Sequence, residues 1–101
     1  MQVVVTRSAR DDLDEIEAYW SARGESERGE KYFNDLTRAA ESRLENLASA
    51  KRGRLYGPEF SQAREILVFG VYRIIYEIDD AAERVNIIRF WHSHRDRPPL
   101  E

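Results

Sequence analysis

The 101-residue chain contains no cysteine, so neither a disulfide nor a thiolate metal site can form in it. A small domain without such cross-links depends on packing alone, which fits a reducing cytoplasm. Long apolar runs are also absent, because no segment approaches the roughly 20 apolar residues of a membrane helix. The N-terminal sequence MQVVVTRSARDD becomes charged too early for a signal peptide. These absences predict a cytoplasmic protein, and we expect a single domain over residues 1–101.

A strong excess of basic residues is missing as well, since the formal net charge is −3. Residues 1–50 hold 7 Lys and Arg against 11 Asp and Glu, whereas residues 51–101 hold 9 against 8. A surface that binds nucleic acid through many phosphates would be uniformly basic. Recognition of an anion is therefore expected to be local and to lie in the C-terminal half.

Two helices are predicted between a first strand over residues 1–5 and a loop over residues 51–58. Ser8 is expected to cap the first helix in a capping-box pattern, and Gly24 is expected to end it. Ser26 is expected to cap the second helix. Apolar side chains recur at spacings of three and four, which indicates one buried face on each helix. They are Ala9, Leu13, Ile16 and Trp20 in the first helix and Phe33, Leu36, Ala40, Leu44 and Leu47 in the second.

Three strands are predicted after the loop, over residues 63–68, 71–78 and 84–92, and their short connections make neighbours antiparallel. The predicted fold is therefore α+β in the order β-α-α-β-β-β. In this fold, a helical hairpin packs on a mostly antiparallel sheet of three to four strands.

Both faces of this sheet are predicted to carry large apolar groups, because side chains alternate along each strand. The single helical hairpin can cover only one face. We therefore expect the other face to bind a partner through Ile75, Ile87 and Trp91. The alternative is that the loop over residues 51–62 folds over it.

Arg73 is a candidate anion ligand in the middle strand. It lies in an otherwise apolar stretch between two tyrosines, and its guanidinium suits a bidentate contact to a phosphate or a carboxylate. The alternative is an ion pair with Glu65 or Glu77 on a half-solvated sheet face.

Two histidines and several arginines follow at the end of the last strand. If the strand continues that far, His92 and His94 point to the same side and can serve as base and acid. Arg89 and Arg95 can neutralise a phosphate in a transition state, and cleavage of RNA needs such a set. The alternative is two exposed histidines at a strand end. The pair makes a poor metal site because a third ligand is not placed beside it, and we expect no metal or cofactor.

Two motifs carry a resemblance to a known family. The strand Tyr72-Arg73-Ile74-Ile75-Tyr76 and the ending His92-x-x-Arg95-Asp96, in a β-α-α-β-β-β chain of this length, resemble the RelE/ParE superfamily of bacterial toxins. Its members are the toxins of type II toxin–antitoxin modules and are often described as plasmid stabilisation proteins. The resemblance covers nearly the whole chain. It implies a cytoplasmic, growth-inhibiting toxin that a cognate antitoxin neutralises in a hetero-oligomeric complex.

The superfamily uses two mechanisms, and the resemblance leaves open whether this chain is an enzyme. ParE-like members bind DNA gyrase and need no catalytic set, whereas RelE-like members cleave mRNA on the ribosome. This chain has a net negative charge and lacks a tyrosine after Tyr76, which favours the ParE branch, with RelE-like cleavage as the alternative. In the RelE-like case, the resemblance implies catalytic roles for Arg73, Arg89, His92, His94 and Arg95.

Overall fold

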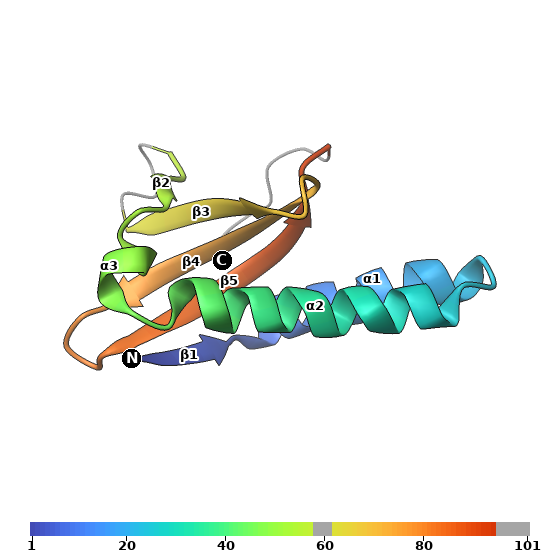
Figure 1. Cartoon of the computed structure of the whole chain (residues 1–101), viewed down its shortest axis with the longest axis horizontal. Coiled ribbons are helices and arrows are strands. Elements are labelled where there is room, and N and C mark those ends of the chain that lie inside the picture. The colour runs from blue at the N-terminus through green and yellow to red at the C-terminus, as the bar shows by residue number, and fades with distance from the viewer. Residues whose placement is uncertain (58–61, 95–101) are drawn as a thin grey trace.

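Two long antiparallel helices pack on one face of a five-stranded sheet in the computed structural model, which describes residues 1–57 and 62–94 (Figure 1). The α+β class and the order of the two long helices and three long strands agree with the sequence prediction. The described sheet has one strand more than the upper expectation, because a two-residue strand forms inside the predicted loop. The elements are β1 (Gln2–Val5), α1 (Arg7–Ala22), α2 (Ser26–Leu44), α3 (Leu47–Ala50), β2 (Arg54–Leu55), β3 (Ala63–Val68), β4 (Tyr72–Asp79) and β5 (Arg84–His92).

The strands lie in the order β1-β5-β4-β3-β2. β1 runs parallel to β5, with Val5 opposite Ile87, and the other three pairs are antiparallel. Because β1 ends at Val5, it leaves the C-terminal half of β5 without a strand on that side. None of the described helices is both long enough and apolar enough to span a bilayer.

Thr6 caps α1 and ties it to the sheet. Its side-chain oxygen accepts a hydrogen bond from the Ala9 amide at 3.4 Å and donates one to the Ile87 carbonyl at 2.7 Å. The helix therefore begins at Arg7, and the expected cap at Ser8 is wrong. The extended backbone of Thr6 suits the cap position. The capping-box pattern is local in sequence, so it could not predict the hydrogen bond from Thr6 to Ile87 of the distant strand β5.

The second helix differs from the prediction mainly at its ends. Gly24 adopts the left-handed conformation, with φ +74°, and follows the end of α1 as expected. Ser26 is the first residue of α2, and Glu25 before it makes no capping hydrogen bond through its side chain. The second helix ends at Leu44, and Asn46 caps the separate α3 by accepting from the Ser49 amide at 2.9 Å.

A bulge in β5 decides which side chains face the helices. Tyr76 pairs with Ile87, whereas the residue before Tyr76 pairs with Arg89, so Ile88 has no partner across the ladder. The extra residue shifts the alternation by one, and both Ile87 and Phe90 enter the core. The expectation that Ile87 lies on a partner-binding face is therefore wrong. The largest fully buried side chains of this core are Tyr76, Phe90, Leu13, Leu36, Leu44, Ile74, Ile87 and Val85.

Ile75 lies on the opposite face of the sheet and is also fully buried. It forms a second, small cluster with Tyr56 and Ala63, and the Tyr56 amide donates to the Ala63 carbonyl at 2.9 Å. The segment after β2 thus covers this part of the sheet, as the alternative prediction proposed. The side chain of Ile75 is not available to a partner.

Candidate functional site

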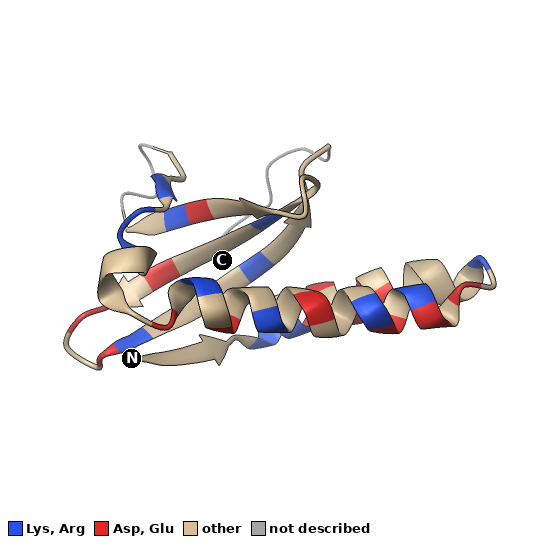
Figure 2. Ribbon diagram, in the orientation of Figure 1, with Lys and Arg blue, Asp and Glu red and all other residues tan. Residues whose placement is uncertain are grey.

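The face of the sheet turned away from α1 and α2, called the open face below, carries the candidate arginines in two cross-strand rows. One row runs Arg54, Glu65, Ile75 and Arg89, and the other runs Leu67, Arg73 and Trp91. Figure 2 shows that the strands carry few charged residues compared with the long helices, so these charges stand out on the sheet. The register therefore brings Arg73 and Arg89 to the same face.

Arg73 is held next to a buried carboxylate. Its guanidinium lies 3.8 Å from Glu65 Oε2, and Arg54 donates to Glu65 Oε1 at 2.5 Å. Glu65 is 5% exposed, while the Arg73 side chain is 30% exposed. The ion pair that formed the alternative interpretation of Arg73 is present. Because two arginines share one carboxylate, this part of the open face still carries a net positive charge.

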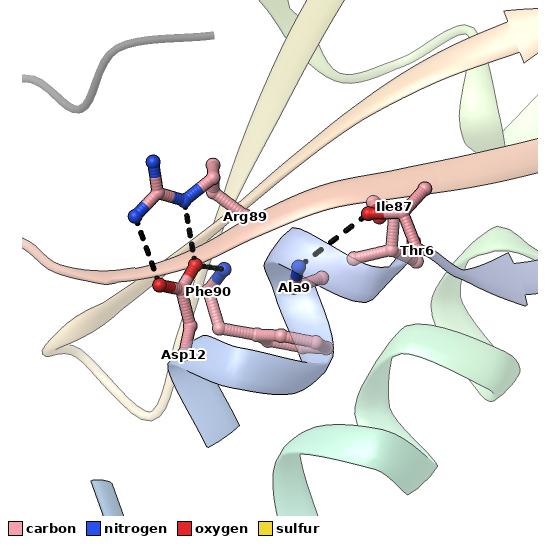
Figure 3. A network of polar contacts seen from close by, with 6 residues as sticks. All are labelled: Thr6, Ala9, Asp12, Ile87, Arg89 and Phe90. Atoms are coloured by element: carbon pink, nitrogen blue, oxygen red, sulfur yellow. Dashed lines mark hydrogen bonds and ion pairs between the residues drawn. The ribbon is translucent and has the colours of Figure 1, made fainter. Parts of the chain in front are cut away.

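Arg89 forms an ion pair with Asp12 of α1 (Figure 3). Arg89 Nε donates to Asp12 Oδ2 at 2.7 Å, and its terminal nitrogen donates to Oδ1 at 2.9 Å. The Phe90 amide donates to Asp12 Oδ2 at 3.1 Å. This bidentate contact raises the pKa of Arg89 above its ordinary value. β1 ends at Val5 and does not pair with β5 as far as Phe90. Asp12 therefore supplies the acceptor for the Phe90 amide that a neighbouring strand would otherwise provide.

The Arg89 guanidinium also lies over the ring of Trp91, 4.6 Å from its centroid. Trp91 is half-buried, and of the three residues expected to bind a partner only Trp91 lies on the open face without being fully buried. Leu67 and Phe69, which were not singled out in the sequence, are 53% and 55% exposed. Their position just before Gly70, where a turn was expected, was the sequence signal for their exposure.

His92 lies on the helix side of the sheet, and His94 follows it in an exposed turn. The His92 ring packs edge-on against Tyr72 of the core, with centroids 5.4 Å apart. The His94 ring lies 5.2 Å from that of His92, and the His94 amide donates to His92 Nδ1 at 3.2 Å. The four described candidates are therefore divided: Arg73 and Arg89 lie on the open face, His92 lies on the other face, and His94 lies beside His92 in the turn that follows. Arg95 lies outside the described residues.

A groove of about 700 Å³ opens between the two long helices and the end of the β4–β5 pair. We call it the aromatic groove. It contains a chain of ring contacts from Tyr19 through Trp20, Tyr32 and Tyr72 to His92, with centroids 5.1–5.8 Å apart. Burial raises the pKa of Tyr72. Its lining residues are Asp12, Glu15, Ile16, Tyr19, Trp20, Tyr32, Val71, Tyr72, Phe90 and His92.

Sequence reasoning assigned Trp20 to the core and missed this groove. The signal was a row of aromatic residues at 19, 20 and 32 in the two helices, and its meaning depends on how the hairpin meets the sheet. Within residues 1–57 and 62–94, His, Asp and Glu side chains do not gather in a group of three or more that is able to hold a metal ion.

Comparisons with solved structures support this architecture. The chromosomal ParDE toxin–antitoxin system from P. aeruginosa has a chain that is 20% identical, with 91% of this chain and 95% of that chain covered and a TM-score of 0.72. The RelBE2 toxin–antitoxin complex from Mycobacterium tuberculosis gives 22% identity, coverage of 93% and 92%, and a TM-score of 0.69. At these identities the likeness establishes the fold alone.

A comparison of sequences identifies the family. No curated protein matches the chain significantly. The sequence model of the family described as ParE toxin of type II toxin-antitoxin system, parDE, matches residues 3–97. This match spans both long helices, β2 to β5 and all of β1 except its first residue. The chain therefore belongs to the ParE toxin family of type II toxin–antitoxin systems.

Proposed function

We propose that this ParE-family toxin acts in the cytoplasm by binding DNA gyrase, and that a cognate antitoxin neutralises it by covering its surface. Membership of the ParE toxin family supports a role as the toxin of a type II toxin–antitoxin module. The resemblance to ParE-like members supports gyrase as the target. The solved relatives from P. aeruginosa and M. tuberculosis belong to toxin–antitoxin assemblies, which supports an antitoxin as partner.

The observation that favours binding over catalysis is the division of the candidate catalytic groups. Cleavage of RNA needs a proton acceptor and cations around one scissile phosphate. Here Arg73 lies beside Glu65, Arg89 is bound by Asp12, and His92 packs on Tyr72 on the other side of the sheet. A phosphate on the open face would meet arginines that already have carboxylate partners, and His92 would be turned away from it.

Expression of the chain without its antitoxin tests this proposal in a bacterial host. We expect growth arrest and induction of a DNA-damage reporter, while primer extension on translated mRNAs finds no new cuts within codons. Co-expression of the antitoxin should restore growth.

The contradicting outcome is cleavage of translated mRNA within codons. If Arg73→Ala and His92→Ala each abolish such cuts, the chain is a RelE-like ribonuclease. Arg38→Ala is the matched control, because Arg38 is an exposed arginine on α2, away from the open face, and its loss should change neither readout.

A further inference from the structure

The aromatic groove carries negative charge and lacks a cation of its own. Its charged lining residues are Asp12 and Glu15, both acidic, and its remaining polar groups are tyrosine hydroxyls, the Trp20 indole and His92. Asp12 is neutralised by Arg89. Glu15 is exposed, and no ion pair joins it to another described residue. Its charge acts on the Arg89 guanidinium without a close ion pair, so the two carboxylates of the lining share one cation. An incoming group therefore meets a net negative charge at the rim of an aromatic surface.

The rings of this groove already attract guanidinium groups on their outer sides. Arg23 lies over the Tyr19 ring, 3.6 Å from its centroid, and Arg28 lies over Trp20 at 4.9 Å. Both arginines come from this chain and are exposed, and neither lines the groove. A cation that enters the groove would gain the same ring contacts and, in addition, the carboxylate of Glu15.

The Trp20 indole contributes a ring to the groove. Its Nε1 atom is buried beside the Tyr72 hydroxyl and is not open to an incoming group. The groove thus combines a carboxylate for a cation with rings for stacking.

From this combination we propose that the aromatic groove binds an arginine side chain of the antitoxin, an inference that rests on the proposed function. The guanidinium makes a bidentate contact to the Glu15 carboxylate and stacks on the neighbouring rings. Arginine suits the site better than lysine, because its planar head stacks on rings and makes bidentate contacts to carboxylates. The occupied groove would join the helical hairpin to the end of β5 through one partner residue.

A titration of the full chain with the tripeptide acetyl-Ala-Arg-Ala-amide tests this inference. Binding is measured from the NMR signals of the two tryptophan indole N–H groups. We expect saturable movement of the Trp20 signal and little movement of the Trp91 signal. The analogue with neutral citrulline in place of arginine should bind about fivefold more weakly or worse, the size expected for a lost ion pair and cation–π contact. Equal binding of the two peptides would overturn the inference.

Two charge variants on α1 sharpen the test. Glu15→Gln should weaken the arginine tripeptide about fivefold. Asp11→Asn removes the same charge from an exposed position that does not line the groove, so it should leave the affinity unchanged. A similar loss in both variants would indicate a general charge effect and would contradict a specific site.

Antitoxin binding by the same variants separates this inference from the proposed function. If the wild-type chain binds the antitoxin and Glu15→Gln weakens that complex about tenfold, both stand. If Glu15→Gln binds the antitoxin as tightly as the wild type, the inference fails while the proposed function survives. If the wild-type chain binds no antitoxin, the proposed function fails, and with it the antitoxin as occupant. Loss of gyrase inhibition alone in Glu15→Gln would assign the groove to the target and overturn the inference.

Discussion

Replacement of Asp12 by alanine is expected to lower the free energy of unfolding by about 3–5 kcal/mol, the usual effect of removing one partner from a buried ion pair. The side chain of Arg89 is only 17% exposed, so its charge would lose its partner in a poorly solvated place. The Phe90 amide would lose its acceptor at the same time. Since a small domain is stable by only about 5–15 kcal/mol, this loss is a large fraction of the total.

Urea unfolding of three variants measures this effect. Asp12→Asn keeps an acceptor for the Phe90 amide but loses the charge, so its loss should be smaller, about 2 kcal/mol. Asp11→Ala changes the exposed neighbouring residue and should stay within about 0.5 kcal/mol of the wild type. A loss below about 1 kcal/mol for Asp12→Ala would mean that the Asp12 network does not fix α1 to β5.

Replacement of Gly53 by alanine is expected to destabilise the fold by about 2–3 kcal/mol through overpacking. A Cβ atom at this position would lie 1.8 Å from the Tyr76 hydroxyl and 2.8 Å from the ring carbon that bears it. Tyr76 cannot easily move away, because it is fully buried and donates to the Ala50 carbonyl at the end of α3. Burial also raises the pKa of Tyr76, which agrees with a neutral hydroxyl in a closed environment.

A double-mutant cycle with Tyr76→Phe tests this contact. Without the hydroxyl, the same Gly53→Ala change should cost at least about 1 kcal/mol less, while the tight approach to the ring carbon keeps some of the penalty. Gly24→Ala is the control, since its cost of about 1 kcal/mol arises from a positive φ in open space and should not depend on Tyr76. An unchanged cost of Gly53→Ala in the Tyr76→Phe background would contradict a direct clash.

The sequence predicted the parts of the fold that depend on local periodicity. Spacings of three and four placed Leu13 and Leu36 on buried helix faces, and both are fully buried. The bulge at Ile88 was not predictable in this way, because a single extra residue leaves the apolar run of β5 unchanged and alters only its pairing. One such residue was enough to move Ile87 from a predicted partner surface into the core.

The site was predicted less well, since its contacts join distant parts of the chain. The pairing of Arg73 with Glu65 was foreseen as an alternative because the strands that carry them are neighbours in sequence. The pairing of Arg89 with Asp12 spans 77 positions and depends on where β1 ends. The aromatic groove likewise depends on the approach of two helices to the far end of a hairpin, for which the sequence has no periodic signal.

We propose that this toxin acts by binding gyrase and not by cutting RNA. The most direct measurement is supercoiling of relaxed plasmid by purified gyrase in the presence of the purified chain. We expect inhibition that rises with toxin concentration and disappears when an equimolar amount of antitoxin is added. Unimpaired supercoiling at a large excess of folded toxin would contradict the account.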